Sequence, residues 1–232
     1  MTDNLQKHDE EQMQKLVALA NKIDVDTVFD VGAYRGLVTD AMRIYFPNAR
    51  YFLFEPQPSR SVDLVRKYKN DCNISVRELV LRDTVGQSEF YVGKFAPTSS
   101  IFDRNKSGTR YFDSEFVMEK KIQVNSDCLD HFCAANNIGH INILKLDTQG
   151  SEHAILLGGS ELLKNQKIDI IFTEFFVVPH YEDAPLFDKI WSLLAKYEYG
   201  LYDLFTGPYA KNGQLRYGDA IFVSNKFRQE KL

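Results

Sequence analysis

The fold of this chain is decided by Thr27-Val-Phe-Asp-Val-Gly-Ala-Tyr-Arg-Gly36. A short apolar run ends here in Asp30, and a Gly-x-x-x-Gly turn then opens an amphipathic segment. A second apolar run, which starts at Tyr51, ends in a single acid, Glu55. This pattern is typical of a parallel sheet that holds a nucleoside, because the glycine turn lets the ligand approach the backbone and the acid on the next strand accepts the ribose hydroxyls.

Length and composition limit the class of protein. With 232 residues, the chain is long enough for one α/β domain with a sizeable core. Its formal net charge of −4 argues against a dedicated nucleic-acid binder, which usually carries a basic excess. We expect no membrane span, since no apolar run is long enough, and no secretory signal. Three cysteines without zinc or disulfide spacing favour a cytoplasmic protein.

Apolar periodicity predicts the order of helices and strands. Apolar residues at helical spacing predict an N-terminal amphipathic helix within residues 1–24. We expect helices between most of the strands, and strands at residues 26–31, 49–54, 74–81, 141–146 and 168–172, followed by an antiparallel pair at 201–205 and 220–223. The chain is therefore expected to form one α/β domain, residues 1–232, on a seven-stranded, mostly parallel sheet.

The alternation of strand and helix fails after the third strand. Residues 82–86 resemble a turn and residues 87–92 alternate like an antiparallel strand, which indicates an inserted hairpin in place of a crossover helix. Residues 94–121 follow without a sustained period, and residues 122–124 close this stretch as a short strand. Because such a long irregular segment in a compact domain is usually functional or mobile, we predict a lid-like insertion.

The first glycine turn restricts the cofactor. A dinucleotide turn needs a second glycine so that pyrophosphate can reach the helix N-terminus, and Tyr34 takes that place here. Asp30 would also repel a pyrophosphate. S-adenosylmethionine carries a sulfonium, an ammonium and no phosphate, so it suits this turn better. We predict that Asp30, Gly32, Tyr34, Gly36 and Glu55 contact it, and Asp30 can also cap the turn.

Two further acids lie near the end of the third strand. Glu78 and Asp83 are candidates for the adenine edge of the cofactor site. Turn residues are often acidic, however, so a purely local role is an equally good interpretation of both.

A second cluster of polar residues, Lys145-Leu-Asp-Thr-Gln-Gly-Ser-Glu-His153, follows the strand expected beside the first one. Asp147 should lie in the same cleft, with Glu174 on the next strand and His180 in the loop after it. A hydroxyl acceptor needs a base, and Asp147 or His180 can serve, although His180 can equally be an ordinary loop histidine. The three side chains can instead hold a divalent metal, which no ligand spacing requires.

Four segments in order resemble the FkbM-type methyltransferases. They are Phe29-Asp-Val-Gly-Ala-x-x-Gly36, Phe54-Glu-Pro-x-Pro58, Leu81-x-Asp-x-x-Gly86 and Leu144-Lys-Leu-Asp-x-x-Gly-x-Glu152. The resemblance spans about residues 25–224. It implies a Rossmann-like class I methyltransferase domain, S-adenosylmethionine as cofactor, and methylation of a hydroxyl, often on a sugar of a glycan or on a natural product.

The resemblance also implies roles for single residues. It places the cofactor against Asp30, Gly32, Gly36, Glu55 and the end of the third strand. It places Asp147 and Glu152 where the fourth strand ends. The chain departs from the family at Gln149, where Glu is common, and at Tyr34, where a smaller polar residue is common.

The leading hypothesis is an O-methyltransferase that acts on a hydroxyl of a saccharide or related metabolite, that is, on a small-molecule or glycan acceptor. One alternative is a nucleoside-binding protein that has lost turnover. Another is an NAD-dependent oxidoreductase.

Overall fold

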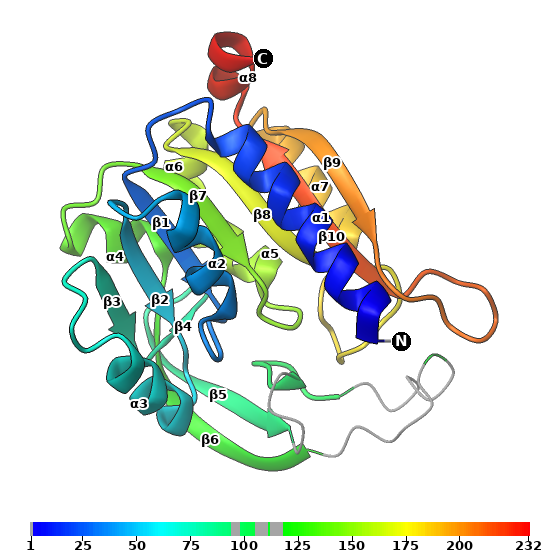
Figure 1. Cartoon of the computed structure of the whole chain (residues 1–232). Helices are drawn as coiled ribbons and strands as arrows, with labels where there is room; N and C mark the ends of the chain where they lie inside the picture. Colours follow the sequence, from blue (N-terminus) through cyan, green and yellow to red (C-terminus); the bar gives the residue numbers. More distant parts are fainter. Residues whose placement is uncertain (1, 94–97, 105–110, 112–117) are drawn as a thin grey trace.

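Helices and strands alternate along most of the chain (Figure 1). The computed structural model describes residues 2–93, 98–104, 111 and 118–232. The helices are α1 (Thr2–Ala20), α2 (Leu37–Tyr45), α3 (Pro58–Lys67), α4 (Leu129–Ala135), α5 (Glu152–Leu157), α6 (Ser160–Lys164), α7 (Phe187–Lys196) and α8 (Asn225–Lys231). The strands are β1 (Thr27–Val31), β2 (Arg50–Phe54), β3 (Ile74–Arg77), β4 (Val80–Leu81), β5 (Gly86–Gly93), β6 (Met118–Asp127), β7 (Ile141–Leu146), β8 (Ile168–Phe176), β9 (Gly200–Thr206) and β10 (Tyr217–Val223).

The main sheet has seven strands within the described residues, in the order β3-β2-β1-β7-β8-β10-β9. Strands β3, β2, β1, β7 and β8 run parallel, whereas β10 is antiparallel to both β8 and β9. This arrangement confirms the predicted sheet and its antiparallel final pair. The parallel strands all end at the same edge, where the polar segments predicted to form the site begin.

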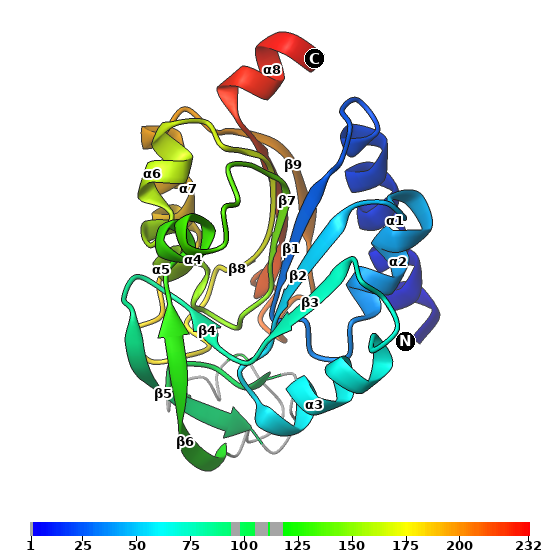
Figure 2. The same cartoon turned by 90° about the vertical axis from the view of Figure 1, so that its left-hand side faces the viewer.

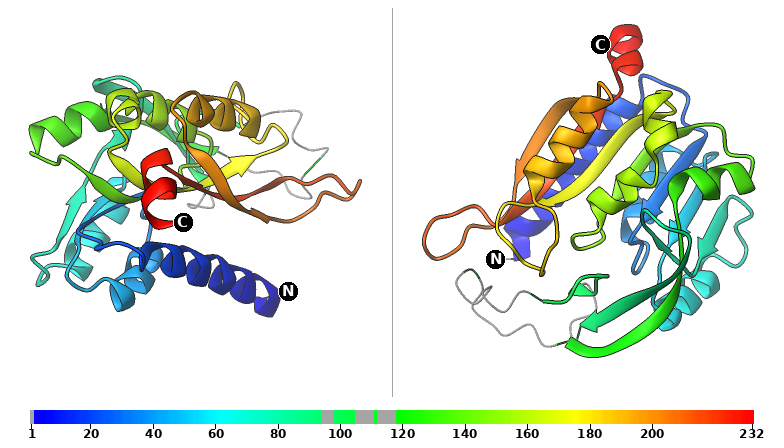
Figure 3. Two further views of the ribbon diagram at one scale, coloured as in Figure 1. Left: turned by 90° about the horizontal axis from the view of Figure 1, so that it is seen from above. Right: turned by 180° about the vertical axis from the view of Figure 1, so that it is seen from behind.

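Helices cover both faces of the main sheet, α1 to α3 on one face and α4 to α7 on the other (Figures 2 and 3). Successive side chains of a strand point to opposite faces, so Val28 packs with α1 and α2 while Phe29 packs with α4. The apolar alternation of helix and strand therefore builds two cores, one on each side of a sheet whose central strands are fully buried.

The insertion after β3 forms a second sheet in the order β4-β6-β5. Strands β5 and β6 pair antiparallel as expected, but β6 is longer than the strand predicted at 122–124. The third strand was predicted to run to Leu81 and this was wrong, because Val80 and Leu81 pair with β6 instead of β2. Most of the predicted lid lies outside the described residues, so the lid stays a prediction.

None of the described helices combines the length and apolarity needed to cross a bilayer. Cys72, Cys128 and Cys133 are free thiols. Strand β7 has the bounds that the apolar pattern predicts.

Candidate functional site

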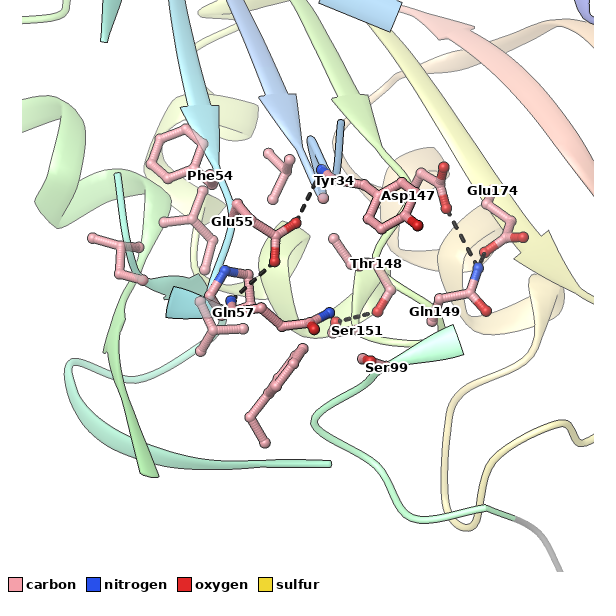
Figure 4. A pocket seen from close by; sticks show the side chains of 17 residues that line it. Tyr34, Phe54, Glu55, Gln57, Ser99, Asp147, Thr148, Gln149, Ser151 and Glu174 are labelled. Carbon is pink, nitrogen blue, oxygen red and sulfur yellow. Dashed lines mark hydrogen bonds between the residues drawn. The ribbon is translucent and has the colours of Figure 1, made fainter. Parts of the chain in front are cut away.

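A cavity of about 230 Å³ lies where β1, β2 and β7 end (Figure 4). Glu55 lines it from the end of β2, and Asp147 lines it from the end of β7. Four lining residues, Leu79, Val80, Leu81 and Phe90, give the cavity an apolar wall. A cavity lined by both acidic groups and apolar side chains suits a nucleoside with its ribose and its base.

Glu55 is held by two backbone donors. The N–H of Tyr34 donates to its Oε2 and the N–H of Gln57 donates to its Oε1, both at 2.9 Å (Figure 4). Burial raises the pKa of the Glu55 carboxyl, and the two N–H donors act against that rise. Each carboxylate oxygen has a further lone pair, so Glu55 can still accept hydrogen bonds from ribose hydroxyls.

Two glycines shape the turn after β1. Gly32 has a φ of +78°, and an added Cβ would lie 1.9 Å from the carbonyl oxygen of Asp147. Gly36 has a φ of +70°, begins α2 and lies against the hydroxyl of Tyr68, outside the cavity lining. Between them Tyr34 lines the cavity, and its ring lies 5.0 Å from the Arg60 guanidinium.

Asp30 is buried behind the turn and does not line the cavity. The hydroxyl of Thr39 donates to its Oδ2 at 2.7 Å, and the ammonium of Lys145 lies 3.0 Å from its Oδ1. These are the contacts of a residue that fixes the turn. The direct contact with the cofactor, expected for Asp30 from the sequence, stays a prediction.

Lys145, which was not among the predicted site residues, joins the turn after β1 to the end of β7. Its ammonium donates to the carbonyl of Gly32 at 3.2 Å and lies 3.6 Å from Asp147 Oδ2. Burial acts to lower the pKa of Lys145, but the carboxylates of Asp30 and Asp147 outweigh it and raise the pKa, so the lysine is cationic. A lysine inside the apolar run 141–146 was the available signal, since a buried charge is normally paired.

Gln149 connects the two acids that were predicted to lie together. Its Nε2 donates to Glu174 Oε2 at 2.8 Å and to Asp147 Oδ1 at 3.4 Å (Figure 4). The hydroxyl of Tyr181 donates to Gln149 Oε1 at 2.7 Å and fixes the direction of the amide. Burial raises the pKa of Glu174 well above its usual range, and the charges of Asp147 and Glu152 raise it further.

His180 lies elsewhere than the sequence suggested. It is buried and outside the cavity lining, with its ring 4.3 Å from that of Phe176 and 5.6 Å from that of Tyr217. Burial, together with the charges of Arg216 and Arg104, lowers the pKa of His180 to about 3. A buried imidazole of such low basicity is poorly suited to act as a base, so Asp147 is the better candidate.

Glu78 and Asp83 are exposed and do not line the cavity. The chain leaves the main sheet between β3 and β4, which brings the apolar side chains of residues 79–81 to the cavity in their place. Asp83 instead pairs with Arg82 at 3.1 Å. Leu79, Val80 and Leu81 are three apolar residues in a row, so the sequence carries no signal that the chain leaves the main sheet here.

Glu152 supports the loop after β7 from inside. Its Oε1 accepts the N–H and the hydroxyl of Thr148, and its Oε2 accepts the N–H of Gly150. Among the described residues, no group of three or more His, Cys, Asp or Glu side chains is placed to hold a metal ion.

The model of the FkbM methyltransferase domain matches residues 30–201, which is most of the chain. The chain belongs to the FkbM methyltransferase family. It is accordingly an S-adenosylmethionine-dependent methyltransferase, as the sequence motifs predicted. The alternative function, that of an NAD-dependent oxidoreductase, therefore has no support.

One relative and two solved structures describe the similarity further. The 2-O-methyltransferase NoeI of Sinorhizobium fredii (strain NBRC 101917 / NGR234) is 25% identical over 192 residues, 80% of this chain and 77% of that protein. Methyltransferase FkbM of Methylobacillus flagellatus KT has a TM-score of 0.53 at 12% identity over 86% of this chain, which spans 44% of that protein. Magnesium protoporphyrin IX methyltransferase of Synechocystis PCC 6803, solved with bound S-adenosylmethionine, has a TM-score of 0.53 at 9% identity over 96% of this chain and 83% of that one. The two structures show that this family member has the class I methyltransferase fold.

The cavity fits S-adenosylmethionine. Gly32 has no side chain to collide with the backbone of Asp147, and Glu55 offers a carboxylate for the ribose. The apolar wall formed by residues 79–81 and Phe90 can cover the adenine. Asp147, whose side chain is 47% exposed, also lines the cavity and adds negative charge that suits the sulfonium of S-adenosylmethionine.

Proposed function

We propose that this family member transfers a methyl group to a hydroxyl of a saccharide or related metabolite, with Asp147 as the base. The observation that carries the proposal is the pair Asp147 and Glu174, joined by Gln149 in the lining of the cavity. Two acids that accept hydrogen bonds suit an acceptor rich in hydroxyl groups. The name of the relative NoeI, a 2-O-methyltransferase, supports oxygen as the methylated atom.

The residues around the cavity have separable roles in this proposal. When bound, S-adenosylmethionine supplies a methyl group on a positively charged sulfur. Glu55 and the apolar wall hold the nucleoside, while Asp147 takes the proton that the acceptor hydroxyl releases. Most of the rate enhancement comes from alignment of the acceptor oxygen, since methyl transfer is an in-line displacement. A positioned base contributes about 10²–10⁴-fold more.

Transfer of a labelled methyl group tests the proposal. The protein is incubated with labelled S-adenosylmethionine and a panel of sugars, lipids and small phenols, and products are identified by their mass shift. Label on a sugar hydroxyl supports the proposal. Label only on nitrogen or carbon, or binding of S-adenosylhomocysteine without transfer to any member of the panel, contradicts it.

A further inference from the structure

A second hollow, a groove of about 670 Å³, lies between α1 and α2 against the main sheet. Both helices cover the same face of the sheet, as the view from above shows (Figure 3). Asp147 and Glu174 line this groove and also line the cavity assigned to the cofactor. The groove therefore leads to the two acids from a different side than the cavity does.

The inner end of the groove is acidic. Glu174 and Asp219 are neighbours in the register of β8 and β10, and Gln12 donates from Nε2 to Asp219 Oδ2 at 2.9 Å. Asp147 adds a third carboxyl group beside them. Lys145 also lines this end, but its ammonium is engaged by Asp30 and Asp147. Carboxyl groups form hydrogen bonds with hydroxyl groups, and ionised ones repel anions, so this end favours a polyhydroxylated group that carries no negative charge.

The side of the groove that α2 forms is apolar and exposed, whereas α1 contributes polar residues besides Met13. Leu37, Ala41 and Ile44 follow one another at helical spacing on α2, so they form one stripe along the groove. Leu37 is 68% exposed, Ile44 77% and the neighbouring Tyr45 49%. Met13 of α1 also lines the groove. Large apolar side chains gathered along a groove that ends at reactive acids indicate a surface that an apolar ligand covers.

We propose that this groove binds the methyl acceptor, and that the acceptor is an uncharged polyhydroxylated head group joined to an apolar chain. The head group of the acceptor lies at Asp147, Glu174 and Asp219, where one of its hydroxyls can contact the base. The apolar chain of the acceptor lies along the stripe on α2. This inference rests on the proposed function and adds the class of acceptor to it. A protein partner fits less well, because the groove runs inward to the acids.

Pairs of model acceptors test whether the apolar chain of the acceptor is recognised. Neutral sugars are offered as methyl glycosides and as octyl glycosides, below the concentration at which micelles form, with labelled S-adenosylmethionine. A fully buried methylene contributes about fourfold in affinity, so we expect kcat/KM to be about tenfold or more higher for the octyl glycoside of an accepted sugar. Ile44→Glu should bring that ratio close to one. Val65→Glu, on α3 outside the groove, should leave the ratio and the basal activity unchanged.

A binding measurement without turnover separates this inference from the proposed function. Octyl glucoside should shift the NMR signals of labelled methyl groups in Met13 and Ile44, whereas methyl glucoside should not. Shifts without methylation of any sugar would support the groove and contradict the proposed function. Equal kcat/KM for both glycosides of an accepted sugar, or unshifted signals, would overturn the inference. Methylation of a sugar phosphate as fast as of the neutral sugar would overturn the uncharged head group.

Discussion

The ammonium of Lys145 lies 3.0 Å from Oδ1 of Asp30, and the two side chains are 5% and 1% exposed. A buried pair of this kind cannot lose one partner without leaving an uncompensated charge in the interior. The pair also ties the turn after β1 to β7, because the same ammonium donates to the carbonyl of Gly32. The geometry of the cofactor cavity therefore depends on an interaction outside it.

Replacement of Asp30 should destabilise the whole domain. Asp30→Asn leaves Lys145 buried without its nearest carboxylate, so we expect the free energy of unfolding to fall by about 3–5 kcal/mol. Urea unfolding measures this. Lys189→Ala, which removes a pair in which both side chains are exposed, should change it by about 0.5 kcal/mol or less. A loss under about 1 kcal/mol for Asp30→Asn would contradict the assigned role of the pair.

Replacement of Glu55 should weaken cofactor binding. Glu55→Gln replaces a charged acceptor by an amide whose NH2 group faces one of the two backbone N–H donors. The Kd of S-adenosylhomocysteine should therefore rise about 10- to 100-fold. Isothermal calorimetry gives the value. Glu78→Gln is the matched control, since Glu78 is exposed and outside the cavity, and its Kd should equal that of the unchanged protein. Equal affinities for all three proteins would remove Glu55 from the cofactor site.

Replacement of Asp147 should slow the reaction and spare binding of the cofactor product. Asp147→Asn keeps the shape of the side chain and loses its basicity, so kcat should fall about 10²–10⁴-fold. The Kd of S-adenosylhomocysteine should change about threefold or less, far below the effect expected at Glu55. Asp83→Asn, an exposed acid outside the cavity, serves as control. An unchanged kcat would exclude Asp147 as the base.

Glu174 should make stability depend on pH. Its pKa in the folded protein is raised by burial and by neighbouring carboxylates, so the stability it contributes is complete below the unfolded pKa of about 4.3. That contribution is lost as the pH rises through the folded pKa. Glu174→Gln, which resembles the protonated form, should therefore be more stable than the unchanged protein at pH 8.5, with a smaller difference at pH 5.

Urea unfolding at the two pH values measures this dependence. Glu161→Gln is exposed on α6 and should show the same difference from the unchanged protein at both. If Glu174→Gln behaves like Glu161→Gln, burial of Glu174 does not determine its protonation.

A pair of glycine substitutions separates close approach from backbone strain. Gly32 and Gly213 have φ values of +78° and +82°, but only at Gly32 would an added Cβ meet a neighbouring backbone atom. Gly213→Ala should cost about 1 kcal/mol through its backbone conformation, and Gly32→Ala should cost about 2 kcal/mol more. Urea unfolding of both variants measures the two losses, and equal losses would mean that the backbone of Asp147 moves aside without cost.

The parts of the fold that repeat a local pattern could be predicted from sequence. Strand β7 has the bounds that its apolar run predicts. The break after Arg77 could not be predicted. Val80 and Leu81 are as apolar as the residues of a continuing strand, but they leave the main sheet and pair with β6, which lies far along the chain. The apolar wall of the cavity was missed for the same reason.

Within the site, strand ends were predictable and loop side chains were not. Asp147 and Glu174 come together because β7 and β8 are parallel neighbours. His180 follows β8 by a few residues, but its ring turns into an aromatic cluster with Phe176 and Tyr217 that no periodicity indicates. Lys145 was overlooked because its partner Asp30 lies on another strand, which sequence spacing does not show.

Asp147 and Glu174 line both the cavity and the groove, whereas every other lining residue belongs to one of the two, so we infer that each hollow gives its own access to the acids. Neither substrate would then block the other's path, and the spent nucleoside could depart before the methylated product does. Kinetics of random order follow from this: initial-rate plots should intersect, and S-adenosylhomocysteine should compete with the donor while acting as a mixed inhibitor against the acceptor.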